Sequence, residues 1–130
     1  MRSSPVVQTR HLQIHNEYDV VAMRQEVRQV ARDLGLGLSQ QAKIATAIST
    51  ISRALISANC SATMGIRLDD LASRPTLEII CQLAVSHLSA DLTQLEQLLH
   101  FGEARALVDE ASLALDSGGA TLCLRMWLNR

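Results

Sequence analysis

Aromatic side chains are scarce in this chain of 130 residues, where they make up 2% of the sequence. Tyr18, Phe101 and Trp127 are too few and too scattered to form a stacking platform for single-stranded bases. Neither sign of charge is in large excess, because 12 basic and 13 acidic residues leave a net charge of −1. A clustered basic face typical of nucleic-acid binding is therefore not expected, and we expect no nucleic-acid partner.

Long apolar runs are also absent. No run approaches the roughly 20 residues that cross a bilayer, and the first residues lack the apolar stretch of a signal peptide. The three cysteines, Cys60, Cys81 and Cys123, are widely spaced and form no C-x-x-C motif. Reduced, buried thiols are the expectation for such a pattern. The sequence thus predicts a cytoplasmic protein without membrane contact and without a metal site.

What the chain does have is apolar content, with 48% hydrophobic residues. This length and composition predict one domain with a sizeable core. Residues 1–9 contain Pro5 and small polar side chains, which indicates a flexible leader. We expect the single domain to occupy residues 10–130.

Hydrophobic periodicity predicts the first elements. Alternation over 10–16 indicates a short strand, and apolar residues at helical spacing over 20–34 indicate an amphipathic helix. Asp19 is expected to cap this helix and Gly35 to follow its end. A second helix is expected from Ser39, as its cap, to about Ala58.

The second half predicts two strands, two short helical pieces and a closing hairpin. We expect Ser89 to cap the first of these pieces. The expected elements are strands over 64–69 and 77–85, helices over 92–99 and 102–108, and hairpin strands over 111–115 and 120–128. Strand pairs separated by helix pairs favour an α+β two-layer sandwich over a doubly wound parallel sheet. We expect a mixed, mostly antiparallel sheet with helices on one face.

Several phrases of the sequence resemble a known family. Tyr18-Asp19-Val20-Val21-Ala22-Met23-Arg24-Gln25, Ala31-Arg32-Asp33-Leu34-Gly35 and Gln41-Ala42-Lys43-Ile44-Ala45-Thr46-Ala47-Ile48-Ser49 are similar to the anti-sigma-factor serine kinases of bacterial partner switching, especially the stressosome switch kinase. The helix over 102–110, the Gly-Gly-x-Thr hairpin and Leu124-Arg125-Met126-Trp127-Leu128 look similar too. The resemblance implies the GHKL (Bergerat) fold of histidine-kinase-like ATPases.

The resemblance also implies a nucleotide site, from which this chain departs. The family carries Glu-x-x-x-Asn on its second helix, where Glu positions water or acts as base and Asn binds Mg²⁺. Here the phrase runs from Thr50 through Arg53 to Ala54. Ala54 has no oxygen for a hard cation, and Thr50 is no base near neutral pH.

The second nucleotide motif of the family, Asp-x-Gly-x-Gly, is missing too. Leu83 stands where the resemblance places the adenine acceptor, and Val85 and His87 stand where glycines allow close backbone approach. The chain between this motif and residue 101 is too short for the family's glycine-rich lid. We therefore expect a degenerate site at Thr50, Arg53, Ala54, Leu83, Val85 and His87, with its pocket filled or collapsed.

The leading hypothesis is a catalytically degenerate switch-kinase-like protein with no cofactor, which binds proteins in a partner-switching, anti-sigma or stress-response pathway. The resemblance implies a STAS-domain antagonist, a sigma factor or a phosphatase as partner. Arg24, Arg28 and Arg32 are candidates for docking it, although such a row is usually a solvated face. The alternatives are an active serine/threonine kinase or ATP-binding anti-sigma factor that uses Mg-ATP in a rearranged site, and an unrelated α+β domain. A homodimer through the N-terminal strand is also expected.

Overall fold

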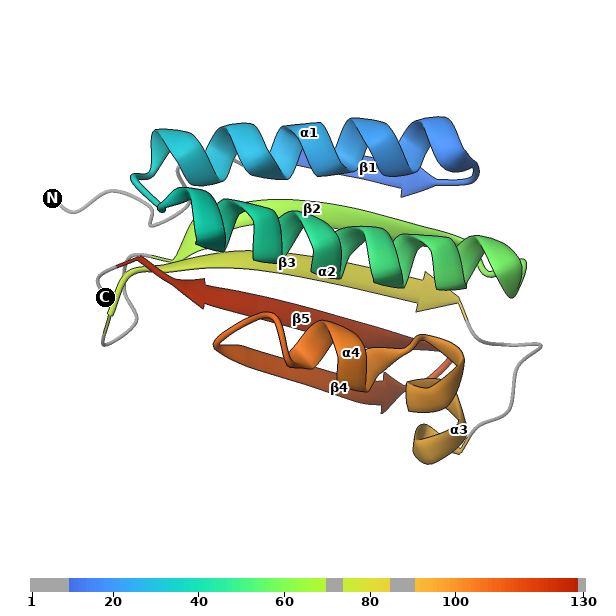
Figure 1. Cartoon of the computed structure of the whole chain (residues 1–130). Helices are drawn as coiled ribbons and strands as arrows, with labels where there is room; N and C mark the ends of the chain where they lie inside the picture. The colour runs from blue at the N-terminus through green and yellow to red at the C-terminus, as the bar shows by residue number, and fades with distance from the viewer. Residues whose placement is uncertain (1–9, 70–73, 85–90, 129–130) are drawn as a thin grey trace, which may run out of the picture.

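A five-stranded sheet carries all the helices on one of its faces (Figure 1). The computed structural model describes residues 10–69, 74–84 and 91–128. The strands follow the order β1-β2-β3-β5-β4, and all four neighbouring pairs are antiparallel. The elements are β1 (Arg10–Ile14), α1 (Glu17–Asp33), α2 (Leu38–Ser57), β2 (Ala62–Asp69), β3 (Thr76–Ala84), α3 (Leu92–Leu98), α4 (Phe101–Arg105), β4 (Glu110–Asp116) and β5 (Gly119–Trp127). The predicted α+β two-layer sandwich is confirmed, but the described strands form a wholly antiparallel sheet and not the mixed sheet that was expected.

Helix α1 begins one turn earlier than the sequence predicted. Asn16, not Asp19, is its N-cap, and its side chain accepts from the backbone N–H of Asp19 at 3.1 Å. The Asp19 carboxylate in turn accepts from the backbone N–H of Asn16 at 3.2 Å. This reciprocal capping box satisfies two amide groups that the first turn leaves without helical partners. Gly35 follows the end of the helix at φ +89, as predicted.

Helix α2 also begins before its predicted cap. Gly37 is the N-cap and makes no side-chain capping bond, so Ser39 lies inside the first turn. The buried side chain of Gln41 donates to the carbonyl of Leu36 at 2.9 Å and ties this turn to the preceding loop. The apolar stripe of the helix packs in the core through Ile44, Ile48, Ile51 and Leu55.

The core lies between the helices and the near face of the sheet. Strand residues that point to the helices are almost all buried and apolar, as their alternation predicts. They include Met64, Ile66, Leu77, Ile79, Cys81, Leu122 and Leu124. Strand β3 pairs with both β2 and β5, so it is central, as its two partly apolar faces indicated.

The short helices α3 and α4 complete the helix layer, and α4 contacts α2. Asp91 caps α3 by accepting from the backbone N–H of Thr93 at 2.8 Å, while the predicted cap, Ser89, lies outside the described residues. His100 separates α3 from α4 with φ 55 in the left-handed region. This residue turns the chain so that Phe101 and Ala104 of α4 are buried.

One sequence expectation falls on residues that the structure does not describe. The leader, residues 1–9, lies outside the described part, so the division into leader and domain remains a prediction. No helix among the described residues is long and apolar enough to cross a membrane.

Candidate functional site

A groove of about 540 Å³ runs between the second half of α2 and the junction of α3 and α4. Its lining consists of small and polar side chains with few apolar ones: Thr50, Arg53, Ala54, Ser57, Ala58, Gln97, Leu98, His100 and Glu103. The predicted pocket is therefore open, not filled, beside Thr50 and Ala54, whereas it is packed at Leu83, and its part at Val85 and His87 lies outside the described residues. Helix α4 contacts α2, and beside the groove α2 presents mainly the small side chains of Thr50, Ala54 and Ser57.

The α2 wall follows from helical spacing. Thr50, Ala54 and Ser57 lie at i, i+4 and i+7, so their side chains share one stripe. Ala54 is buried and supplies only a methyl group, whereas Thr50 is half-buried and Ser57 is exposed. This wall therefore offers two hydroxyl oxygens and no carboxylate.

Arg53 turns its guanidinium toward α1. It donates from Nη2 to Oε2 of Glu17 at 2.7 Å and from Nε to Oε1 at 3.3 Å. These hydrogen bonds lower the pKa of the Glu17 carboxyl and raise the pKa of Arg53. Both side chains are more than half exposed, so the pair links the two helices at the surface of the groove.

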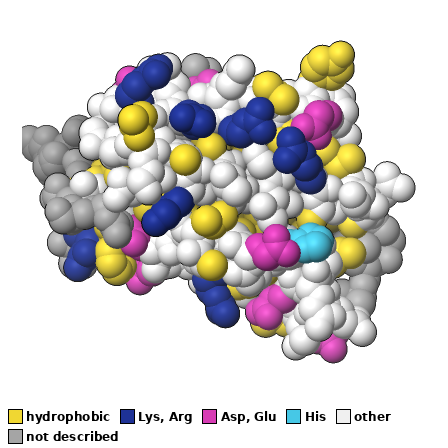
Figure 2. Space-filling model, viewed as in Figure 1, with side chains coloured by type: hydrophobic (Ala, Val, Ile, Leu, Met, Phe, Trp, Pro, Cys, Tyr) yellow, Lys and Arg dark blue, Asp and Glu magenta, His cyan; other side chains and the backbone are white. Residues whose placement is uncertain are grey.

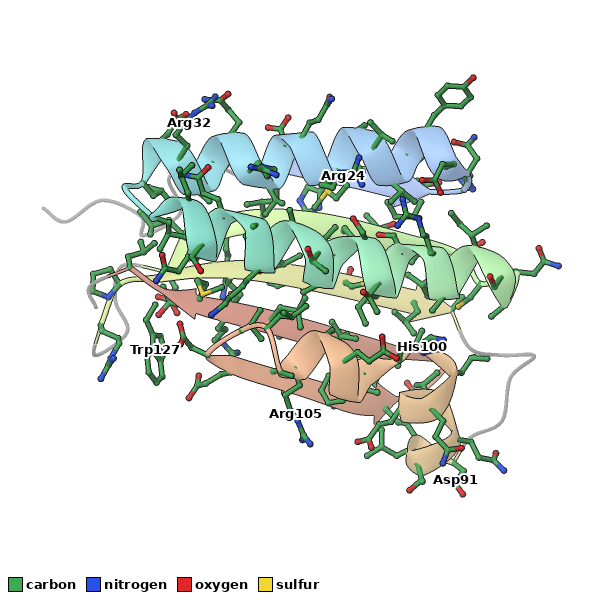
Figure 3. The ribbon with its side chains drawn as sticks, in the orientation of Figure 1. Arg24, Arg32, Asp91, His100, Arg105 and Trp127 are labelled. Atoms are coloured by element: carbon green, nitrogen blue, oxygen red, sulfur yellow. The ribbon has the colours of Figure 1, made fainter. Side chains whose placement is uncertain are left out.

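The opposite wall carries a second polar pair. Nδ1 of His100 lies 3.2 Å from Oε2 of Glu103, one turn further along the chain, and both side chains are exposed. Figure 3 shows His100 where α3 meets α4. His100, Glu103 and Gln97 could not be predicted from the sequence, because the left-handed turn at His100 has no glycine or asparagine to indicate it.

The donor set of the groove suits a hard cation poorly. Mg²⁺ is usually held through one or two carboxylates in near-octahedral geometry. Among the described residues that line the groove, Glu103 is the one carboxylate, and it faces His100. Within the described ranges no group of three or more His, Cys, Asp or Glu side chains could hold a metal ion. Glu103, helped by the hydroxyls of Thr50 and Ser57, is the best oxygen source that the groove offers.

The structure brings only part of the predicted site together. Thr50, Arg53 and Ala54 line the groove, but the side chain of Leu83 is 4% exposed and packs in the hydrophobic core. Leu83 is not among the residues that line the groove. Val85 and His87 lie outside the described residues, so their placement stays a prediction.

The arginines of α1 lie on the outer surface of the helix layer. Arg28 and Arg32 are exposed and Arg24 is half-buried. Figure 2 shows Lys and Arg side chains gathered over α1 and the adjoining part of α2, and Figure 3 shows Arg24 and Arg32 projecting from α1. The side chain of Arg32 also donates to Gln29. The row is therefore accessible, which suits both a solvated face and a docking face.

Comparison with known proteins finds a distant relationship. Forty-two residues, 32% of this chain, are 50% identical to the serine/threonine-protein kinase RsbT of Bacillus subtilis (strain 168). The match covers 32% of that kinase, so it spans about a third of each protein. No family model matches the chain. The similarity supports a relationship to such a kinase over this segment.

Proposed function

We propose that this chain is a switch-kinase-like protein of the GHKL type that has lost Mg-ATP chemistry. In this proposal it acts in the cytoplasm as a protein-binding regulator of a bacterial partner-switching pathway. The observation that carries the proposal is the α2 wall of the groove, where Thr50 and Ala54 stand in place of the base and the magnesium ligand that the resemblance implies. The local identity to a serine/threonine kinase supports the choice of family.

Loss of the reaction follows from the chemistry of those two side chains. A methyl group cannot coordinate a cation that demands oxygen, and a hydroxyl with its high pKa cannot accept the proton of an attacking nucleophile near neutral pH. The core position of Leu83 adds a third departure, because an alkyl side chain cannot accept a hydrogen bond from adenine. A fold that keeps its helix layer without this chemistry can still bind other proteins.

The α1 arginines are the proposed docking residues. Arg24, Arg28 and Arg32 are spaced at i and i+4, so they follow one side of α1. Guanidinium groups pair with carboxylates through well-oriented hydrogen bonds. The proposal expects an acidic surface on the partner, which is a STAS-domain antagonist, a sigma factor or a phosphatase.

Charge reversal tests this docking surface. STAS-domain proteins, sigma factors and phosphatases of the source bacterium are purified and titrated singly onto the immobilised chain. The triple variant Arg24→Glu, Arg28→Glu, Arg32→Glu is expected to weaken binding of the true partner by more than tenfold, since like charges then face each other. Arg105→Glu, an exposed arginine on α4, is the matched control and should bind as the wild type does. If the wild type, the triple variant and Arg105→Glu all bind the partner equally well, this docking surface is rejected.

The open groove favours a second candidate, an active serine/threonine kinase with a rearranged site. Its volume of about 540 Å³ suits a small-molecule ligand, and Glu103 would then supply the carboxylate oxygen for Mg²⁺. This candidate predicts saturable Mg-ATP binding and phosphate transfer to a serine of the partner. Both activities should fall in Glu103→Gln, whereas the leading proposal predicts neither activity in the wild type.

A homodimer remains part of the proposal. Strand β1 lies at the edge of the sheet and pairs with β2 on one side only, among the described residues. A second β1 could pair with it across a two-fold axis. Sedimentation of a monomer alone at high micromolar concentration would reject the dimer.

A further inference from the structure

The sheet face opposite the described helices has a cavity, called here the hole, at Gly65. Gly65 on β2 pairs with His11 of β1 and with Ile80 of β3. Thr63 and Arg67, two residues away along β2, share its face. All of these residues, together with Gln82, line a cavity of about 200 Å³. Gly65 itself is buried, and because glycine has no side chain it places no Cβ in this cavity.

The size of the hole points to a single side chain. Its volume lies below the roughly 300–1,000 Å³ of small-molecule sites. Ile80 is half-buried and gives an apolar wall, while His11, Thr63 and Gln82 bring polar groups. Protein interfaces concentrate their binding energy in a few side chains that fill such pockets and exclude water. A Leu, Met or Phe side chain would match the apolar wall.

The charged side chains around the hole indicate which kind of group lies next to the inserted apolar side chain. The described lining includes the guanidinium of Arg67 and the imidazole of His11 and no carboxylate. Glu78, on the same face, accepts from both Arg67 and Arg125, which leaves one positive charge in excess, and Asp69 and Glu110 lie farther out. A carboxylate next to the inserted side chain would therefore meet a cation at the wall of the hole.

Arg67 is held in place by a buried carboxylate. Its Nε donates to Oε1 of Glu78 at 2.6 Å, and Nε of Arg125 donates to Oε2 of the same residue at 2.9 Å. Glu78 is 3% exposed, whereas the Arg67 side chain is 41% exposed. Orienting an arginine before a partner arrives reduces the entropy cost of pairing with it. The guanidinium is both accessible and preorganised.

We propose that the hole at Gly65 is a docking pocket for a protein segment that presents Leu, Met or Phe beside Asp or Glu. The apolar side chain enters the hole, and the carboxylate pairs with Arg67. This surface lies on the sheet face opposite the helix layer, which carries the groove and the α1 arginines. The pocket uses no residue of the groove or of the α1 arginine row, so its test is independent of the test of the proposed function.

A peptide selection tests the pocket directly. Random peptides displayed on phage are selected on the chain of residues 1–130, with counter-selection on Gln82→Trp, which covers the hole from an exposed position on its rim. Selected peptides should carry Leu, Met or Phe next to Asp or Glu. Synthetic copies should bind the wild type about tenfold or more better than Gln82→Trp or Gly65→Val. Ala114→Trp, an exposed position on β4 of the same face, is the matched control and should bind as the wild type does.

Amide shifts in solution place the bound peptide. The expected shifts centre on Thr63, Gly65 and Ile80. Melting curves check that the variants fold, and the exposed position of Gln82 keeps the test intact if Gly65→Val does not fold. The proposal is overturned if no peptide is enriched, if the peptides lack the apolar-acidic pair, or if they bind the variants as well as the wild type. It is equally overturned if the wild type self-associates and Gln82→Trp abolishes that association, because the occupant is then a second copy.

Discussion

Arg53 of α2 and Glu17 of α1 form a bidentate ion pair at the rim of the groove, with Nη2 and Oε2 2.7 Å apart. Arg53 lies within the helix phrase that the resemblance equates with a catalytic motif, yet its guanidinium serves an interhelix contact. Glu17 is also the first residue of α1, where a carboxylate favours the positive end of the helix dipole. The pair therefore ties the start of the arginine-bearing helix to the groove wall.

Removing this pair is expected to have a small effect that depends on pH. The pKa of Glu17 lies below its usual value of 4.5 in the folded protein, so its stabilising contribution is complete above the unfolded pKa and is lost as pH falls through the folded pKa. Arg53→Gln should lower Tm slightly at neutral pH, and the difference from wild type should vanish in strong acid. Because both groups are exposed, added salt should shrink the difference as well.

Thermal unfolding at several pH and salt values measures this effect. Arg105 is another exposed arginine on a helix, so Arg105→Gln is the control. Its effect on Tm should be the same in the wild type and in Glu17→Gln. A double-mutant cycle of Arg53→Gln with Glu17→Gln isolates the pairwise interaction. A coupling that persists in strong acid would contradict the account.

Restoring the two α2 side chains should not restore nucleotide binding. Thr50→Glu with Ala54→Asn supplies the base and the magnesium ligand that the resemblance implies. The adenine acceptor position, Leu83, still packs in the core, and each missing buried hydrogen bond costs about 1–3 kcal/mol. We expect no binding of Mg-ATP by isothermal titration. Because position 50 faces an open groove near Arg53, Thr50→Glu alone should change Tm by less than about 2 °C, whereas Asn at the buried position 54 should lower it further. Micromolar binding by the double variant would show that the other ligands are present.

Among the charged side chains on the sheet face opposite the helices, the buried carboxylate of Glu78 should contribute most to the free energy of unfolding. Both of its oxygens accept from arginines, Arg67 and Arg125. Glu78→Ala leaves two neighbouring guanidinium groups without this partner. Because these groups are partly exposed, we expect a loss of about 2 kcal/mol in the free energy of unfolding, less than for a fully buried pair. Urea unfolding measures it, with the exposed Glu110→Gln as control. Equal stability of the two variants would refute the role of Glu78.

The capping box of α1 gives a further test. Asn16→Ala removes the side-chain acceptor of the Asp19 amide and should destabilise the protein by about 1 kcal/mol. Ser39→Ala, in the first turn of α2, should have little effect, because Ser39 is not the N-cap there. Urea unfolding of the two variants compares them directly. A larger loss for Ser39→Ala would mean that the sequence prediction had the right cap.

The order of strands and helices could be predicted because each element has its own hydrophobic period. Ile44, Ile48, Ile51 and Leu55 recur at helical spacing, while β3 alternates from Leu77 onward, so local patterns sufficed. Cap residues were harder to predict. Asn16 and Asp19 are both good caps by type, and only the direction of the backbone at Asn16 decides between them.

The site could be predicted only where it lies within one helix. Thr50, Arg53 and Ala54 meet at the groove because α2 alone positions them. Gln97, His100 and Glu103 come from a segment whose approach depends on a left-handed residue and on the packing of Phe101, and neither feature has a sequence signal. The hole at Gly65 depends on strand register, which joins residues as distant as His11 and Ile80.

The central claim, that this fold has lost Mg-ATP chemistry while keeping an open groove, is tested most directly by titrating Mg-ATP into the wild-type chain in a calorimeter. The account predicts no saturable heat up to millimolar nucleotide, because the groove wall offers the methyl group of Ala54 where a magnesium ligand is needed. Saturable binding in the micromolar range that is weakened by Glu103→Gln would contradict it and make the chain an active nucleotide-binding protein.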